Sequence, residues 1–157
     1  MKKRTRAREV ALQYLYQHDL MAAQGLADLD EFLKEQDADA EVRRFARDLV
    51  EGTTEVRDAL DREIQAVAQN WQISRMAVVD RNVLRMAAYE MLHTADVPPK
   101  VAINEAIELG KRFSTQKSGA FLNGILDRIK SRAQGGAAAP AGAAAPATES
   151  SDEEGAG

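Results

Sequence analysis

Cysteine is absent from this 157-residue sequence. Its absence excludes disulfide bonds, thiolate metal ligands and a thiol nucleophile together, and it is compatible with a reducing cytoplasm. Aromatic residues are also scarce at 5%, so we expect a core built mainly from aliphatic side chains. The length is sufficient for one compact domain with a buried core.

Long apolar runs are missing as well. No run of uncharged apolar residues approaches the roughly 20 residues that a membrane-spanning helix needs. The basic start, from Lys2 to Arg4, is followed by Arg6, Arg8 and Glu9, where a signal peptide would need an apolar segment. We therefore expect a soluble cytoplasmic protein that does not contact a membrane.

The motifs of common catalytic and metal sites are missing too. His18 and His93 are the only histidines, and neither has a partner at the spacing of a zinc motif. Gly110 and Lys111 resemble a phosphate loop only superficially, because Arg112 stands where Ser or Thr would coordinate magnesium. No Gly-x-Ser-x-Gly nucleophile elbow occurs. We expect no catalytic residue, no cofactor and no metal ion.

Charge is segregated along the chain. The net charge of −4 comes from four acids beyond position 148, because residues 1–132 carry 21 basic and 21 acidic groups. Residues 19–63 hold 14 acids against six bases, and they lie between two basic segments, residues 1–18 and 75–132. Basic segments favour nucleic acid as a partner, whereas the acidic one is either a solvated face or a surface for a basic protein.

Helical periodicity runs through most of the sequence, and no segment is a candidate strand. The pattern predicts about seven helical pieces, at residues 4–20, 28–34, 40–69 with a break at 52–54, 75–93, 99–113 and 119–132. We therefore predict a compact all-α bundle over residues 1–132. The Ala-, Gly- and Pro-rich acidic tail, residues 133–157, cannot bury enough surface to offset the entropy of ordering, so we expect it to be disordered.

Several residues have expected local roles. Pro98 and Pro99 lack a backbone N–H, so one helix must end before them and the next can begin just inside them. Ser74 and Ser118 are expected to be helix N-caps, and Gly124 is expected to mark a close helix contact.

Glu90 lies within an apolar stretch of the sequence. A carboxylate in such surroundings needs a partner, because burying an unpaired charge is costly. We expect it to bond an arginine or a helix N-terminus. A catalytic role is disfavoured because no second acid–base group is near it in the sequence.

Basic residues open the first predicted helix, against the preference of the helix dipole for acids at that end. The cluster comprises Lys2, Lys3, Arg4, Arg6 and Arg8. Phosphate is an obvious counter-charge for such a group. The alternative is an ordinary solvated and frayed terminus, and the residues alone leave both readings open.

Four segments carry a recognisable pattern in a fixed order. They read RAREVALQYLYQ at 6–17, DRNVLRMAAYE at 80–90, VPPKVAINEAIELGK at 97–111 and FLNGILD at 121–127. Together they resemble the NusB family of bacterial transcription antitermination proteins, over about residues 4–132. Members of that family are small all-helical proteins that bind the single-stranded boxA element of ribosomal RNA leader transcripts. They do so together with NusE, a small-subunit ribosomal protein.

The resemblance implies an RNA-binding surface in which cations contact phosphates and an aromatic ring lies beside a base. Its residues are Lys3, Arg4, Arg6 and Arg8 on phosphates, Phe121 next to a base, and Lys117 beside Phe121. The alternative for Phe121 is packing in the core. Lys117 stands where the family often has an acid, which leaves its role open.

The resemblance also implies a protein-binding surface. Tyr16 and Asp80 match positions that face NusE in the family; the alternatives are an ordinary exposed tyrosine and a local helix cap. The acidic middle segment suits a basic ribosomal protein, although this is complementarity of charge and not identification.

The implied function is non-catalytic: a helical platform binds boxA RNA and NusE together and supports processive ribosomal RNA transcription in the RNA polymerase antitermination complex. One alternative is the NusB-like domain of an RNA cytosine methyltransferase, which the absence of cysteine and of a following cofactor-binding domain disfavours. Another is a helical adaptor without an RNA role. The sequence leaves open whether the protein is a monomer or a homodimer that covers the RNA surface.

Overall fold

Residues 2–135 are described by the structure, a computed structural model. Within that range the chain forms seven α-helices, one short 3-10 helix and no strand, which confirms the predicted all-α fold. The elements are α1 Lys3–Leu20, α2 Leu29–Gln36, α3 Ala40–Glu55, α4 Arg57–Val67, η1 Ile73–Arg75, α5 Val78–His93, α6 Pro99–Phe113 and α7 Ser118–Ala133. No helix in the described range is both long and apolar enough to cross a membrane. The predicted tail lies almost wholly outside the described residues.

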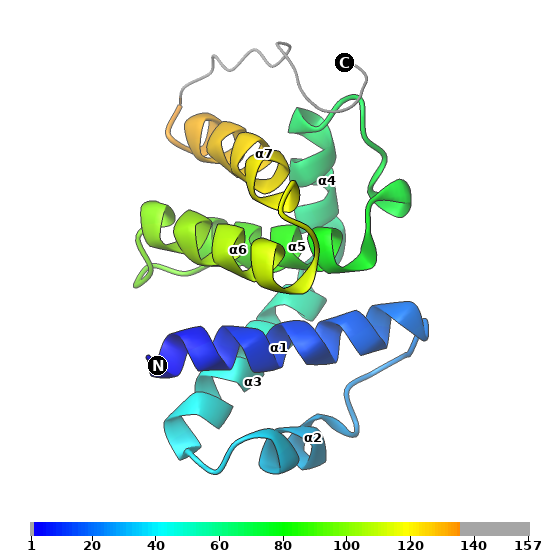
Figure 1. The fold of residues 1–157 in the computed structure, drawn as a ribbon, viewed down its shortest axis with the longest axis vertical. Coiled ribbons are helices and arrows are strands. Elements are labelled where there is room, and N and C mark those ends of the chain that lie inside the picture. The colour runs from blue at the N-terminus through cyan, green and yellow to red at the C-terminus, as the bar shows by residue number, and fades with distance from the viewer. Residues whose placement is uncertain (1, 136–157) are drawn as a thin grey trace.

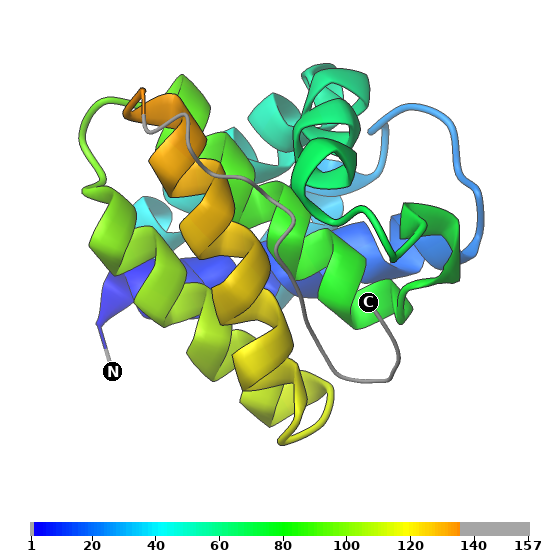
Figure 2. The same cartoon turned by 90° about the horizontal axis from the view of Figure 1, so that it is seen from above.

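Helix α5 is the centre of the bundle. It packs against α1, α3, α4, α6 and α7. In Figure 1, α1 lies between the α5–α6 pair above it and α2 below it, and α3 crosses behind α1. Seen from above in Figure 2, α7 runs alongside α6, and it also packs against α5. The helices that later supply the candidate site, α1, α6 and α7, are thus all held by one central element.

The core is aliphatic, as the low aromatic content predicts. Its largest fully buried side chains are mostly Leu and Ile, including Leu33, Leu60, Ile64, Leu84, Leu122 and Leu126. Burying each such side chain stabilises the fold by about 1.5–3 kcal/mol relative to leaving it exposed. Tyr14 is buried among them and its hydroxyl donates to Asp28 at 2.7 Å, while Tyr16 remains partly exposed on another side of α1.

Helix boundaries follow the predicted breaks closely but not everywhere. Helix α6 begins at Pro99, the position that tolerates a missing N–H. The break in the long middle segment falls at Val56, and Gly52 lies inside α3. A side chain at position 52 would overlap the ring of Tyr89. Glycine is a poor helix former, but here it allows α3 to pack closely on α5.

Two cap predictions are wrong. Ser74 lies in η1, and α5 begins only at Val78 without a side-chain cap. Ser118 is the first residue of α7 and not its cap. Its hydroxyl points instead to Asp80 on α5, because the loop after α6 brings this serine into the interior.

The close contact expected at Gly124 lies elsewhere. A Cβ at Gly124 would meet only a guanidinium nitrogen of Arg128, at 3.7 Å. The tight approach between α6 and α7 is at Gly110, where an added Cβ would overlap the side chain of Leu122. The missing side chain at position 110 therefore lets α7 lie directly on the backbone of α6.

Candidate nucleic-acid interface

The basic residues at the start of α1 differ strongly in exposure. The exposed fraction of the side chain falls from 56% for Lys3 and 52% for Arg4 to 33% for Arg6 and 5% for Arg8. A helix turns by about 100° per residue, so Lys3, Arg4 and Arg6 face different sides. Arg8 shares the side of Arg4 but lies one turn further along the helix, where it is buried. The cluster is therefore not a single surface, and its members need separate treatment.

Lys3 and Arg4 lie on the surface and pair with exposed acids. The ammonium of Lys3 is 2.6 Å from Glu41 and 3.2 Å from Asp39, and hydrogen bonds to these two carboxylates raise the pKa of Lys3. The guanidinium of Arg4 is 3.2 Å from Asp96, which precedes α6. Ion pairs this exposed contribute little, so a phosphate can replace the acid at low cost.

Arg6 is partly covered and ties α1 to the end of α2. Its guanidinium donates to the carbonyl of Gln36 at 3.0 Å and to Asp37 at 3.2 Å, and it reaches Glu9 at 3.4 Å. The bond to Gln36 satisfies a carbonyl at the helix C-terminus that lacks an intrahelical partner. Arg6 therefore has a structural role, with only its edge available to a ligand.

Arg8 is buried, which overturns its assignment to a phosphate. Its Nε and Nη2 atoms donate to the two carboxylate oxygens of Glu90, each at 2.9 Å, and its Nη1 lies 3.4 Å from Glu105. Both members of the Arg8–Glu90 pair are almost completely enclosed. Turning the arginine outward would leave a buried, unpaired carboxylate, which is strongly unfavourable. The same pair confirms the predicted arginine partner for Glu90.

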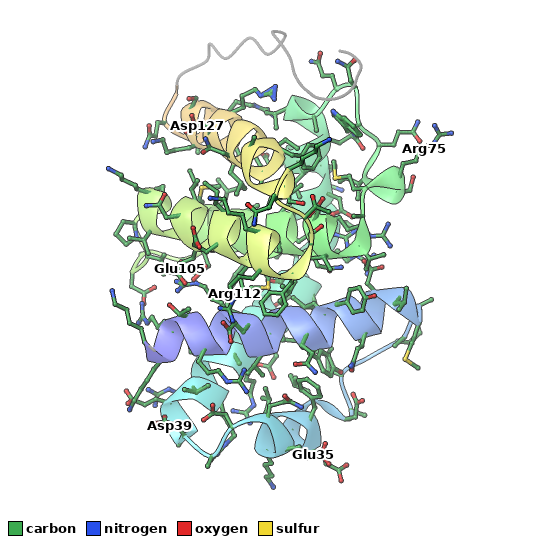
Figure 3. All side chains as sticks on the ribbon, in the orientation of Figure 1. Glu35, Asp39, Arg75, Glu105, Arg112 and Asp127 are labelled. Carbon is green, nitrogen blue, oxygen red and sulfur yellow. The ribbon has the colours of Figure 1, made fainter. Side chains whose placement is uncertain are left out.

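Arg112 is a surface cation that sequence reasoning missed. It belongs to the last turn of α6 and pairs with Glu9, a buried acid of α1 that also accepts from Arg6. Its side chain remains about half exposed. Figure 3 shows Arg112 and Glu105 pointing from α6 toward α1. In the sequence Arg112 is one more charged residue on an amphipathic helix, and only the fold shows that it lies beside the basic start of α1.

Lys117 and Phe121 flank the first turn of α7. Lys117 is exposed, whereas Phe121 is partly buried with its ring centroid 5.3 Å from that of Trp71 in an edge-to-face arrangement. The ring therefore packs at the edge of the core and also reaches the surface. Both readings of Phe121 from the sequence are compatible with this position.

The two groups of predicted RNA contacts lie at opposite ends of α6. Arg4 pairs with Asp96, just before the helix begins, while Lys117 lies just beyond its end. A helix of 15 residues is about 22 Å long, so the structure does not bring these groups together. Arg112 reduces the gap, because it lies in the last turn of α6 and contacts α1 at Glu9. A continuous RNA-binding interface would have to run along the surface where side chains of α1 and α6 meet.

Tyr16 and Asp80 lie near the other end of α1 and the start of α5. Tyr16 is partly exposed. Asp80 is partly buried and accepts a hydrogen bond from the hydroxyl of Ser118 at 2.9 Å. Burial raises the pKa of Asp80, and the hydroxyls of Ser118 and Ser114 offset only part of this effect. The partner-facing role of these residues stays a prediction.

A second charge network holds the C-terminal end of α1. Asp19 accepts from Arg81 at 2.8 and 3.0 Å, from Asn82 at 2.8 Å and from Arg85 at 3.1 Å. Arg85 also binds Asp61 on α4 with two hydrogen bonds of 2.7 and 3.1 Å. Burial alone would raise the pKa of Asp19, but the bonds from Arg81 and Asn82 and the two arginine charges lower it to about 2. These acids are structural, although the sequence suggested a solvated acidic face.

The buried acids of these sites have structural partners. In the part of the chain that the structure describes, no three His, Asp or Glu side chains gather in a way that could hold a metal ion. The buried acids Glu9, Asp19 and Glu90 are each bonded to arginine, an arrangement suited to holding helices together.

The comparison with known proteins identifies the family. The model of the NusB family matches residues 5–131. This chain belongs to the NusB family. Its relatives include transcription antitermination protein NusB of Anaeromyxobacter dehalogenans strain 2CP-1, which is 54% identical over 131 residues, or 82% of this chain and 91% of the relative. NusB of Geobacter sulfurreducens is 48% identical over 132 residues, 83% of this chain and 96% of the relative.

Solved NusB structures share the fold. T. maritima NusB superposes with a TM-score of 0.73 at 39% identity and covers 81% of this chain and 89% of that chain. A crystal structure of the antitermination factors NusB and NusE in complex with double-stranded RNA contains a chain with a TM-score of 0.75 at 26% identity. That match covers 84% of this chain and 98% of the other. The NusB fold thus accounts for nearly all of the described helices.

Proposed function

We propose that this NusB-family protein is a non-catalytic transcription antitermination factor that acts in the cytoplasm. It binds the boxA element of ribosomal RNA leader transcripts together with NusE and so supports processive transcription by RNA polymerase. The observation that carries the proposal is the 54% identity, over 82% of this chain, with a protein named for transcription antitermination. A structural neighbour that was crystallised with NusE and RNA supports the same partners.

The proposed phosphate contacts are the exposed cations along α1 and α6: Lys3, Arg4 and Arg112, with the edge of Arg6 beside them. Each is held by an acid that leaves much of the cation open to solvent. RNA phosphates would compete with these acids, so affinity should fall as salt rises, by about 0.7 log units per log unit of salt for each phosphate neutralised. Arg8 is left out of this set because its charge is enclosed.

Phe121 and Lys117 supply the proposed base-side contact. Recognition of single-stranded RNA requires stacking or base-edge bonds in addition to phosphate contacts. The edge-to-face contact with Trp71 orders the ring of Phe121 before a ligand arrives, which reduces the entropy lost on stacking. Lys117 lies one helical turn before Phe121 and would contact the adjoining phosphate.

NusE is the proposed protein partner, with Tyr16 and the neighbouring surface of α1 as its contact. A protein and an RNA that bind side by side, and that also contact each other, make the second binding step effectively intramolecular. Each partner should therefore bind more tightly when the other is present. Exposed acids on α2 and α3, among them Glu31, Glu35 and Glu51, would favour the approach of a basic protein.

The test compares a boxA RNA oligonucleotide with a scrambled one, with and without NusE, by fluorescence anisotropy at several salt concentrations. We expect preference for boxA, an increase in affinity on adding NusE, and weaker binding with a smaller salt slope for R112A. The matched control is R75A, because Arg75 is an exposed arginine on η1 and lies at the upper right edge of the molecule in Figure 3, away from Arg112.

Two outcomes would contradict the proposal. Equal affinity for boxA and scrambled RNA, even with NusE present, would exclude specific antitermination binding. Normal NusE binding without any affinity for RNA would favour the helical adaptor instead.

A further inference from the structure

A partly buried hydrogen bond joins the start of α7 to the start of α5. The hydroxyl of Ser118 donates to Oδ1 of Asp80 at 2.9 Å. Ser118 is only 3% exposed, so water cannot easily replace its partner. The neighbouring cation Arg81 is turned toward Asp19 on α1. The partners that the structure gives Asp80 are therefore hydroxyl groups of the α6–α7 segment and not a positive charge.

The same serine organises the loop between α6 and α7. Its hydroxyl lies 3.2 Å from that of Thr115 and accepts from the Thr115 backbone N–H at 3.4 Å. The Ser118 backbone N–H donates to the Thr115 carbonyl at 3.0 Å. Helix α7 has no side-chain N-cap of its own. The position of its first turn thus depends on the bond between Ser118 and Asp80.

Packing from α6 fixes the other side of this turn. A Cβ at Gly119 would lie 2.9 Å from Cε of Lys111, so the lysine stem passes directly over the α7 backbone. One turn later Leu122 lies against Gly110. The segment is therefore enclosed between α6 and the Asp80 carboxylate, and a shift on the Asp80 side would move the whole turn.

The two base-side residues of the proposed interface flank this segment. Lys117 immediately precedes Ser118, and Phe121 follows it by three residues on the same helical turn. We infer that Asp80 and Ser118 form a positioning pair for RNA, whose hydrogen bond holds Lys117 and Phe121 in the arrangement that binds a nucleotide. Asp80 thus acts on the RNA through Ser118, without touching the RNA itself. This inference rests on the proposed RNA-binding function.

A positioning role for Asp80 affects RNA binding differently from a direct contact with NusE. A residue that only touches NusE changes the affinity for NusE and leaves binding of RNA alone unchanged. A positioning residue changes the affinity for RNA in the absence of NusE. Ser118 should do the same although it is enclosed and cannot contact a ligand itself.

The test measures binding of boxA RNA alone to D80A, S118A and the double variant by fluorescence anisotropy. Each single variant should weaken binding about five- to tenfold, the scale of one buried hydrogen bond that no longer orders its segment. The double variant should be no weaker than either single one, because both remove the same bond. D80N keeps a carbonyl oxygen that can accept from Ser118, so it should bind within about twofold of the wild type.

The matched control is Y14F, which removes another hydroxyl–carboxylate bond, between Tyr14 and Asp28, away from α7. Y14F should retain wild-type affinity for RNA, which separates positioning from a general loss of stability. Thermal unfolding of every variant checks that it is folded at the assay temperature.

Specific results would overturn the inference. Wild-type affinity of S118A, or a loss in D80A that appears only with NusE present, would show that Asp80 does not position the RNA segment while leaving the proposed function intact. Additive losses in the double variant would show that the two side chains act separately. A wild-type chain that fails to bind boxA RNA would remove both the proposed function and this inference.

Discussion

Arg4 and Arg8 lie one turn apart on α1, and both guanidinium groups lie over the ring of Phe45, at 4.6 and 5.3 Å from its centroid. Their surroundings nevertheless differ. Arg4 is half exposed and pairs with the exposed Asp96 through one contact of 3.2 Å. Arg8 is enclosed and holds Glu90 with two bonds of 2.9 Å. The same residue type at helical spacing thus faces solvent in one case and the core in the other.

The difference shows that a basic run is not one functional unit. An exposed pair contributes about 0–1 kcal/mol, so its cation is available to a competing anion. In a buried pair neither side chain can turn away, because the other charge would then be left unpaired in the interior. Whether a basic side chain can bind RNA should therefore depend on its exposure and not on its position in the sequence.

The largest effect should come from breaking the buried pair. R8A leaves Glu90 enclosed without its partner and should lower the free energy of unfolding by about 3–5 kcal/mol. Urea unfolding followed by circular dichroism measures this loss. The double variant R8M/E90L replaces both charges with apolar groups and should recover most of it. A loss below about 1 kcal/mol in R8A would contradict the assignment.

Asp19, the buried acid at the C-terminal end of α1, provides the next test. The pKa of Asp19 is about 2, below the value near 3.9 expected in the unfolded chain. Its ionised form therefore stabilises the fold above pH 4, and this contribution, on the order of 2 kcal/mol, is lost as the pH falls from about 4 to 2. Urea midpoints measured across this range should decrease for the wild type, and the decrease should be smaller in D19N. Parallel curves for the two proteins would argue against the assignment.

Removing the exposed arginine should separate stability from binding. R4A should change the free energy of unfolding by less than about 1 kcal/mol. In the same variant, affinity for boxA RNA should fall and the salt slope should decrease by about 0.7, the value for one phosphate contact on a single strand. Salt titrations of RNA binding provide the measurement, with R75A as the control that should keep the wild-type slope.

The smallest effect should come from the acid that pairs with Arg4. D96N keeps the shape of the side chain and removes its charge, so stability should remain within about 0.5 kcal/mol of the wild type. Arg4 would lose its competitor for phosphate, and RNA should bind slightly more tightly. Weaker binding by D96N would indicate that Asp96 orients Arg4 for RNA and does not compete with it.

The fold could be predicted because its signals are local. Apolar residues at helical spacing, the pair Pro98–Pro99 and the lack of candidate strands specify an all-α bundle without any knowledge of distant contacts. The positions that failed depend on packing between helices. Ser74 has the side chain of a good cap, but η1 takes up that stretch, and Gly124 has an open environment that no sequence pattern shows.

The candidate site was less predictable, because pairing of charges is a long-range property. The sequence indicated that Glu90 needs an arginine or a helix N-terminus and that Arg8 needs a counter-charge, yet it could not show that these two requirements meet across 82 positions. Arg112 was missed for the same reason, since its partner Glu9 lies on another helix. Lys3 is exposed, as a lysine at the end of a helix usually is.

Trp71 is the only tryptophan in the chain, and its ring lies 5.3 Å from that of Phe121. The protein therefore carries one indole, which can be excited separately from its three tyrosines and which lies beside the aromatic side chain proposed to receive a base. A change in its emission spectrum on adding unlabelled oligonucleotide would report events at that end of α7 and would be insensitive to phosphate contacts along α1. Optical titration of the unmodified protein can thus distinguish arrival of a base from neutralisation of charge.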